Sequence, residues 1–235
     1  MAKRGACVSM SNREKALGGV LLGVYLAVLP YASKPAFALA EKLLGISLGE
    51  TARNAIYYYV LFALTVIVFW GYLVRSAQAL ADRLGAVLAA AGLGLVAFYG
   101  LNELTGRLLG LVTAGQTNLN DASIAGRIGA SPWSTILIVV FLAPVVEETL
   151  FRGYLFGNLR EVNRALAYAV SCLLFALLHV WQFAAASRDP AYLLLGIQYL
   201  VPGAVMAWTY ERSGCLWGSV LLHGAVNALA VASMM

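Results

Sequence analysis

The chain has 235 residues, of which 61% are hydrophobic and only 11% are charged, and its mean hydropathy is +0.80. This composition excludes an ordinary soluble domain and is typical of a protein that crosses the membrane several times. The formal net charge of +5 comes from 16 Lys and Arg residues scattered between apolar runs, so it indicates membrane topology rather than a nucleic-acid partner.

Seven apolar runs are long enough to cross a bilayer as helices, because about 20 residues span a core of about 30 Å. The first run follows a basic N-terminal stretch without a clear cleavage pattern, so we interpret it as a membrane helix rather than a signal peptide. Segment 35–48 has a helical apolar stripe but is short, which fits an interfacial, re-entrant or eighth spanning helix. The seven expected helices cover 16–33, 54–74, 81–100, 133–158, 164–182, 190–210 and 216–234.

Segment 101–132 is the most polar stretch and contains clusters of turn-forming residues, so we expect a long external loop there. The loop divides the chain into an N-terminal part, 1–130, and a C-terminal helical part, 131–235. With the N-terminus in the cytoplasm, ten basic residues fall on or near the cytoplasmic side and six on the other. This difference favours a cytoplasmic N-terminus.

Six polar side chains inside the expected helices mark a candidate site, because such groups are costly in a membrane unless they are paired or face a wet cavity. Two of them are the only histidines of the chain. A single histidine on an apolar helix is more often a structural hydrogen-bonding group than a catalytic one. Two histidines together with a carboxylate pair favour function. The six residues are Glu147, Glu148, Arg152, His179, His223 and Asn227.

Helical spacing shows which of these groups can meet. Glu148 and Arg152 are four residues apart and are expected to form an ion pair. Glu147 points about 100° away from Glu148 and is free to face another partner. With a rise of about 1.5 Å per residue, Glu147, His179 and His223 lie at intermediate depth on three antiparallel helices. Asn227 lies one turn after His223 on the same helix face.

These residue types suit hydrolysis of a peptide bond. A buried carboxylate with a nearby imidazole can activate a water and pass its proton to a leaving amine. Glu147 and His179 fit these roles. His223 and Asn227 offer two donors for a developing oxyanion.

A covalent nucleophile is disfavoured. No serine has the setting of a nucleophile with its base and acid partners, and Cys172 lies seven residues from His179, too far for direct contact. The other two cysteines, Cys7 and Cys215, add no disulfide or zinc-type spacing.

Zinc is an open alternative, because Glu147, His179 and His223 could form a set of two histidines and one glutamate with water as the fourth ligand. The chain has no HExxH motif, and Asn227 is a poor zinc ligand. We therefore favour chemistry without a metal or another cofactor.

Three motifs in this order resemble the CPBP family, the CAAX proteases and bacteriocin-processing membrane enzymes that include the Rce1-type prenyl-protein endopeptidases. They are EExxxR (Glu147 to Arg152), FxxxH (Phe175 to His179) and HxxxN (His223 to Asn227), and the resemblance covers about 130–235.

The resemblance implies an all-α bundle of about eight spans whose catalytic core is 131–235, with a cavity open toward the cytosol. It implies a glutamate-type intramembrane endopeptidase in which Glu147 activates the water, His179 assists, and His223 and Asn227 stabilise the oxyanion. Glu148 and Arg152 are then supporting residues. The expected substrate is a membrane-tethered protein or peptide cleaved near its C-terminus. The short chain favours a prokaryotic cell membrane.

A noncatalytic role is the alternative from another class. A bacteriocin-immunity factor, a scaffold or a small transporter could use Glu147 and His179 as a proton relay. Substrate-dependent proton flux in liposomes would indicate transport, and activity that survives mutation of the site residues would indicate a scaffold.

Overall fold

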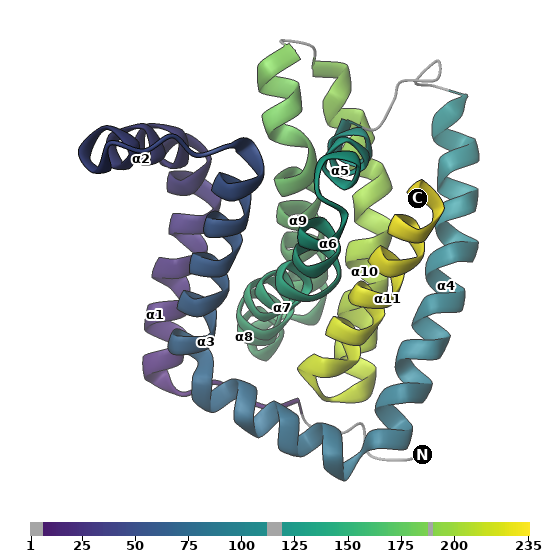
Figure 1. Cartoon of the computed structure of the whole chain (residues 1–235). Helices are drawn as coiled ribbons and strands as arrows, with labels where there is room; N and C mark the ends of the chain where they lie inside the picture. The colour runs from purple at the N-terminus through teal and green to yellow at the C-terminus, as the bar shows by residue number, and fades with distance from the viewer. Residues whose placement is uncertain (1–6, 112–118, 188–189) are drawn as a thin grey trace.

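The computed structural model describes residues 7–111, 119–187 and 190–235, and these residues form helices and turns with no β-strand (Figure 1). The predicted all-α bundle is confirmed. Among the described residues, seven helices are long and apolar enough to cross a membrane, as the sequence predicts, so the protein is an integral membrane protein. The candidate spans are Asn12–Leu44, Glu50–Asp82, Leu84–Leu108, Pro132–Val162, Arg164–Ala185, Tyr192–Ser213 and Leu216–Met234.

Within these spans, several helices contain π-helical or 3₁₀ segments, named η. In chain order the elements are α1 (Asn12–Gly23), η1 (Val24–Val28), α2 (Leu29–Leu44), α3 (Glu50–Asp82), α4 (Leu84–Gly110), α5 (Leu119–Ala130), α6 (Pro132–Ile136), η2 (Leu137–Leu142), α7 (Ala143–Glu148), η3 (Thr149–Phe156), α8 (Gly157–Val162), α9 (Arg164–Ser187), η4 (Pro190–Gly196), α10 (Ile197–Ser213) and α11 (Leu216–Met234).

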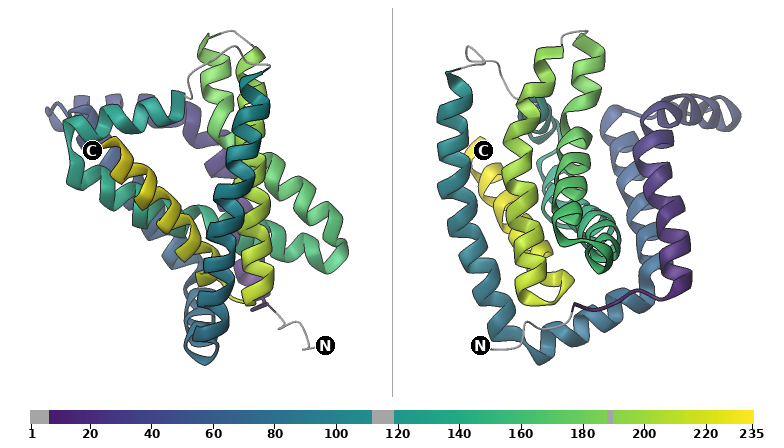
Figure 2. Two further views of the ribbon diagram at one scale, coloured as in Figure 1. Left: turned by 90° about the vertical axis from the view of Figure 1, so that its right-hand side faces the viewer. Right: turned by 180° about the vertical axis from the view of Figure 1, so that it is seen from behind.

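The helix ends gather at two opposite faces of the bundle. At the first, the α1 face, the start of α1 lies beside the end of α8, and Lys15 forms an ion pair with Glu161 at 3.0 Å. At the second, the α5 face, α5 packs against α6 and against α11, whose C-terminal end lies there (Figure 2). The start of α1 and the helix α5 are therefore on opposite sides of the protein.

The predicted helix over 35–48 begins earlier and ends at Leu44, as part of α2. Gly45 terminates it in a left-handed conformation with φ 65°, which glycine adopts at little cost. Helix α2 has no buried residue and turns sideways away from α1 at the α5 face (Figure 1). The following turn, 45–49, matches a GxSxG pattern, but its exposed Ser47 follows a helix rather than a strand and does not line the pocket described below.

The prediction of a long loop over 101–132 is wrong for the described residues. Helix α4 continues to Gly110, and α5 covers most of the remainder, while 112–118 lie outside the described residues. Packing explains the difference, because α5 buries Ile128 and contacts α9 and α11, so an apolar stripe outweighs the turn-forming residues on its exposed side.

The span Pro132–Val162 is the most deeply packed of the seven, with 61% of its most apolar stretch buried, against 22–50% for the others. It contains two π-helical segments, η2 and η3, on either side of α7. Such segments frequently occur at functional sites. Glu147 and Glu148, the last two residues of α7, therefore lie in the centre of the bundle.

Candidate active site

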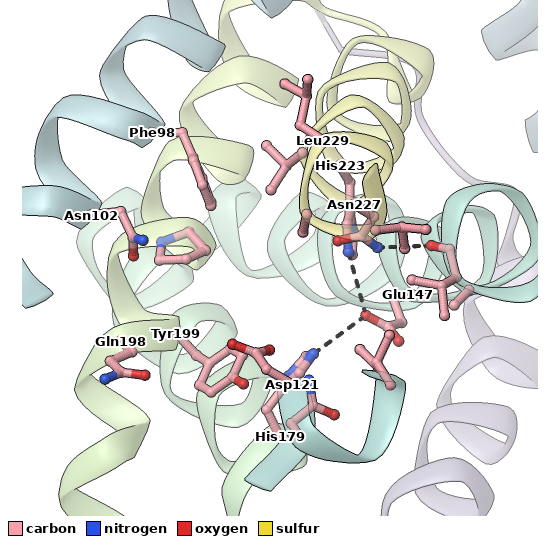
Figure 3. Close-up of a pocket in the computed structure, with 18 of the residues that line it drawn as sticks. Phe98, Asn102, Asp121, Glu147, His179, Gln198, Tyr199, His223, Asn227 and Leu229 are labelled. Atoms are coloured by element: carbon pink, nitrogen blue, oxygen red, sulfur yellow. Dashed lines mark hydrogen bonds and ion pairs between the residues drawn. The ribbon is translucent and has the colours of Figure 1, made fainter. Parts of the chain in front are cut away.

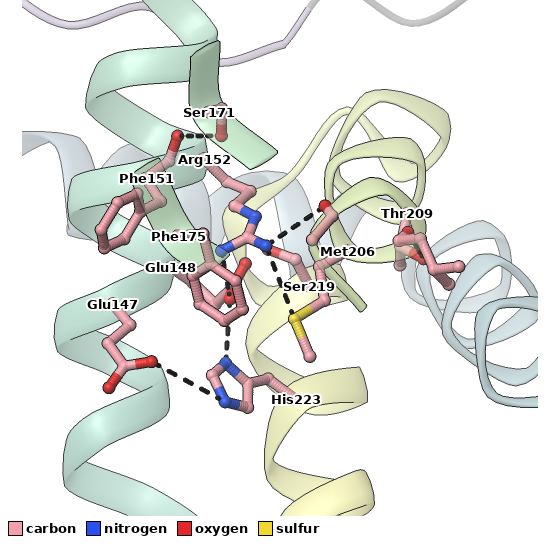
Figure 4. Close-up of polar contacts among 12 residues, drawn as sticks. Glu147, Glu148, Phe151, Arg152, Ser171, Phe175, Met206, Thr209, Ser219 and His223 are labelled. Atoms are coloured by element: carbon pink, nitrogen blue, oxygen red, sulfur yellow. Dashed lines mark hydrogen bonds and ion pairs between the residues drawn. The ribbon is translucent and has the colours of Figure 1, made fainter. Parts of the chain in front are cut away.

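The ion pair expected between Glu148 and Arg152 is present in the centre of the bundle (Figure 4). Both side chains are fully buried, and Arg152 Nη1 lies 3.0 Å from Glu148 Oε1. Arg152 Nη2 also donates to the carbonyl of Gly203 at 3.2 Å, and the guanidinium lies 4.2 Å from the centre of the Phe175 ring. The arginine therefore binds α7, α9 and α10 together, in addition to balancing the charge of Glu148.

Glu148 also anchors His223, which sequence spacing does not reveal. His223 Nδ1 lies 2.9 Å from the same Glu148 Oε1 that binds Arg152. Because a carboxylate accepts hydrogen bonds, His223 Nδ1 carries the proton and donates it. The other ring nitrogen, Nε2, then points toward Glu147 (Figure 4). Glu148 therefore orients one of the two histidines.

Glu147 occupies a different environment from its neighbour. Its side chain is buried, and Oε2 has no hydrogen-bond partner among the described residues. This oxygen lies 3.9 Å from His179 Nε2 and 4.0 Å from His223 Nε2 (Figure 3). Within the described chain, no lysine or arginine is close enough to pair with it. Glu147 is therefore a buried carboxylate between two imidazoles.

His179 is oriented by its own helix and by α10. Its Nδ1 lies 2.8 Å from the carbonyl oxygen of Phe175, which only accepts, so Nδ1 carries a proton and Nε2 of the neutral ring has a free lone pair. The ring stacks on Tyr199 with centroids 4.5 Å apart and planes at 20°. Tyr199 gives no signal in the sequence, because an aromatic residue in a membrane helix is unremarkable.

Asn227 makes a contact that helical spacing alone does not predict. Its Nδ2 donates to the carbonyl of Val139 in η2 at 2.8 Å. In η2 the N–H of Ala143 bonds to Ile138 O, five residues back, so the next N–H would reach Val139 O. That next residue is Pro144, which has no N–H. Asn227 thus satisfies a carbonyl that Pro144 leaves without a donor.

This contact predicts coupling between Asn227 and Pro144. Replacing Asn227 by alanine leaves a polar carbonyl unsatisfied and should lower the free energy of unfolding by about 1–3 kcal/mol. In a Pro144→Ala background the restored N–H can bond within the helix, so the loss should fall by at least half. Unfolding of the four proteins in detergent measures this coupling. The control is Asn102→Ala, which changes a pocket asparagine on α4 and should lower the free energy of unfolding equally in both backgrounds. If Asn227→Ala also had the same effect in both backgrounds, Asn227 would not compensate for Pro144.

The four expected catalytic residues line a pocket of about 560 Å³. Among its lining residues, Glu147, Phe175 and His223 lie near the middle of their spans, and other lining residues lie on the halves of α4, α10 and α11 that lead to the α5 face. The structure thus brings Glu147, His179, His223 and Asn227 together, whereas Glu148 and Arg152 lie behind the lining. Other residues of the lining include Tyr58, Phe98, Tyr99, Asn102, Ile124, Gln198, Tyr199, Met206, Val226, Leu229 and Met234.

Helix α5 adds charged groups to the pocket, which the prediction of a loop over 101–132 did not anticipate. Asp121 and Arg127 both line it. Partial burial raises the pKa of the Asp121 carboxyl above its usual value, and the nearby His179 opposes this shift. From the N-terminal spans, Tyr25 in η1 is buried with its side chain beside Glu147. The N-terminal half of the chain therefore contributes directly to the site.

The described residues contain no group of three His, Cys, Asp or Glu side chains with the separations of a metal site. The two imidazoles nevertheless have the orientation found in zinc sites, where the second ring nitrogen donates to a carboxylate or a backbone carbonyl. The separations of 3.9 and 4.0 Å between Glu147 Oε2 and the two Nε2 atoms leave space for a bridging water. A metal would require the three side chains to move closer.

Comparison with known proteins supports a membrane peptidase. Residues 129–229 match the family described as type II CAAX prenyl endopeptidase Rce1-like, which confirms the resemblance seen in the motifs. The UPF0177 protein YxdF of Lactococcus lactis subsp. lactis is 32% identical over 38% of this chain and 44% of its own length. A protein of Bacillus subtilis named "Putative membrane peptidase YdiL" is 29% identical over 50% of this chain and 43% of its own length.

These similarities are limited to part of each protein. Another relative, named UPF0177 protein in abiGi 5'region, from Lactococcus lactis subsp. cremoris, is 33% identical over 42% of this chain and 37% of its own length. The chain thus spans less than half the length of these curated relatives. No solved structure matches the chain.

Proposed function

We propose that this protein is an intramembrane endopeptidase that hydrolyses a peptide bond with a water activated by Glu147. One observation carries the proposal: a buried carboxylate oxygen without a hydrogen-bond partner faces two oriented imidazoles at 3.9 and 4.0 Å in the depth of a pocket. A polar separation of this size accommodates a bridging water. The similarity of 129–229 to the Rce1-like endopeptidases supports the same chemistry.

In the first step Glu147 takes a proton from the water, whose oxygen attacks the carbonyl carbon of the substrate. Neutral His179 accepts a hydrogen bond from the water at Nε2 because its Nδ1–H is held by Phe175. The proton then passes from Glu147 to the nitrogen of the breaking bond, either directly or through His179. The C–N bond of the tetrahedral intermediate then breaks and gives a carboxylic acid and an amine, and the acid passes its proton to the amine, so the products are a carboxylate and an ammonium group.

The negative oxygen that forms during attack needs hydrogen-bond donors. His223 can supply one from Nε2 when that atom carries a proton, and the Glu148 carboxylate holds the ring in place through Nδ1. Asn227 can supply only the N–H that does not bond to Val139. His223 is therefore the stronger of the two proposed oxyanion donors, and Glu148 acts on the reaction through it.

A zinc-dependent form of the same protease is the second candidate, favoured by the orientation of both histidines through their Nδ1 atoms. The two forms are separated by treatment of the purified protein with a strong chelator. The metal-free proposal predicts unchanged cleavage and no stoichiometric zinc by elemental analysis. Loss of cleavage that added zinc restores would establish the metal-dependent form.

The proposed activity is tested on the purified protein in lipid vesicles, with N-palmitoylated peptides of mixed sequence as probes and mass spectrometry of the products. We expect new peptide ends with wild-type protein and none with His179→Ala. The proposed substrate is a membrane-tethered protein or peptide that is cut near its C-terminus. A proton relay would instead acidify or alkalinise proteoliposomes without cleaving any peptide.

The orientation of the protein follows from the two faces. We propose that the α1 face is cytoplasmic, because the described basic residues near it outnumber those near the α5 face. The seven near the α1 face are Arg13, Lys15, Arg75, Arg83, Arg160, Arg164 and Arg212. The five near the α5 face are Lys34, Lys42, Arg53, Arg107 and Arg127.

This orientation conflicts with one expectation from the resemblance. With a cytoplasmic α1 face, the part of the bundle that lines the pocket, next to α5, lies toward the opposite side of the membrane, which differs from the expected cavity open toward the cytosol. Reporters fused after Met235 decide between the two orientations. Alkaline phosphatase should be active there and green fluorescent protein dark; the reverse result would place the pocket toward the cytosol and the N-terminus outside.

A further inference from the structure

We propose that Arg127 is a binding site for the C-terminal carboxylate of the substrate. This inference rests on the proposed peptidase function and adds to it a group that recognises the substrate. Arg127 belongs to α5, before the segment 129–229 that matches the endopeptidase family. Its side chain lines the same pocket as Glu147.

The hydrogen-bonding state of Arg127 shows an unused binding edge. Its Nη1 donates to Asn54 Oδ1 at 3.2 Å. Its Nε is buried without a hydrogen-bond partner, and the described residues provide no partner for Nη2 either. Nε and Nη2 form one edge of the planar guanidinium, and two parallel bonds from such an edge suit a carboxylate. Among the described residues, the one hydrogen bond that this cation donates is therefore to a neutral amide.

The charges around the pocket favour an anion at this position. Among the described lining residues, Arg127 is the only arginine or lysine, whereas Asp121 and Glu147 are acidic. Glu50 borders a second, smaller cavity beside Arg127 but does not come within ion-pair distance of it. Arg127, on the part of the lining formed by α5, is thus the place in the described pocket where a permanent positive charge favours a carboxylate.

The position of Arg127 in the pocket suits the C-terminal end of a peptide better than an internal segment. Arg127 lies at the α5 face, Glu147 lies at the deep end, and the wall between them includes Ile138, Val139 and Ala143. An extended peptide whose terminal carboxylate binds Arg127 can reach Glu147 with a bond a few residues from its end. A lipid phosphate on Arg127 is the competing source of negative charge, and the test below separates the two.

Binding can be measured without cleavage by using the Glu147→Gln variant in nanodiscs. The probes are fluorescent N-palmitoylated peptides without acidic residues, made either as free acids or as C-terminal amides. Each set is titrated against proteins with Arg127, Arg127→Gln or Arg127→Lys. Arg107→Gln is the matched control, because Arg107 is an exposed arginine near the same face that pairs with Glu103.

We expect amidation to weaken binding to the Arg127 protein by about 10- to 100-fold, since a bidentate charged contact is lost. Arg127→Gln should weaken binding of the free acids by a similar factor and leave binding of the amides unchanged. Arg127→Lys should give an intermediate loss for the acids, because it keeps the charge but not the planar edge. Arg107→Gln should change neither set.

Equal binding of acids and amides by the Arg127 protein would overturn the inference. A loss of the same size for both sets in Arg127→Gln would also overturn it and would indicate a lipid or structural role. These outcomes are independent of catalysis. Failure of wild-type protein to cleave either set would refute the peptidase proposal, while the comparison of acid and amide would still decide the role of Arg127.

Discussion

Replacing Glu147 by glutamine is expected to abolish peptide hydrolysis in a protein that remains folded. Glutamine keeps the size of the side chain but cannot accept a proton from water, so the rate should fall by about 10³-fold or more. Because Glu147 Oε2 accepts no hydrogen bond from the described residues and meets only the two imidazoles, at 3.9 and 4.0 Å, the free energy of unfolding should change little. Cleavage of the palmitoylated peptides and thermal unfolding in detergent measure the two effects.

The control for this variant is Glu161→Gln, which makes the same chemical change on the exposed end of the same span, where the carboxylate pairs with Lys15. That protein should cleave at the parental rate. Full activity of Glu147→Gln would exclude Glu147 as the general base. A loss of activity accompanied by unfolding would assign Glu147 a structural role instead.

Replacing Arg152 by leucine should have the largest effect on stability, lowering the free energy of unfolding by about 3–5 kcal/mol. The change leaves Glu148 buried with its charge paired only to His223, and it removes the contacts to Gly203 and Phe175. The matched control is Arg107→Leu. It breaks an ion pair with the same four-residue spacing on an exposed surface, so its effect should be at most about 1 kcal/mol.

Combining Arg152→Leu with Glu148→Gln should recover part of that stability, because the uncompensated carboxylate is gone. It should not recover activity, since His223 loses the carboxylate that orients it. Glu148→Gln alone should both slow cleavage and destabilise the protein, because it also leaves the buried Arg152 without an opposite charge. If Arg152→Leu and Arg107→Leu destabilised the protein equally, the buried ion pair would not stabilise the core in the way described.

The sequence predicts the bundle and the pairing of Glu148 with Arg152 because both follow from local rules. Long apolar runs reveal spans, and a four-residue spacing reveals a pair on one helix. The depth estimate for Glu147, His179 and His223 also leads to side chains that converge in the structure. The match of 129–229 to a membrane endopeptidase family agrees with the motifs that contain these residues.

The remaining features depend on contacts between helices that are distant in the chain. No spacing rule could pair His223 with Glu148 across 75 positions, or Asn227 with a backbone carbonyl of η2. Pro144 is the one local signal, since a proline inside a helix leaves a carbonyl without a donor. The polar stretch that forms α5 has the composition of a loop, and its helical state depends on packing against other helices. For this reason the sequence does not predict that Arg127 lines the pocket.

If this protein cleaves membrane proteins with a water activated by Glu147, the ends of membrane proteins in cells should depend on Glu147. Membrane proteins would be isolated from the native host after deletion of the gene and after complementation with either wild type or Glu147→Gln. Mass spectrometry then maps their C-termini. We predict that defined C-termini, a few residues short of the encoded ends, appear only with wild type. The same truncated ends in cells that carry Glu147→Gln would contradict the claim.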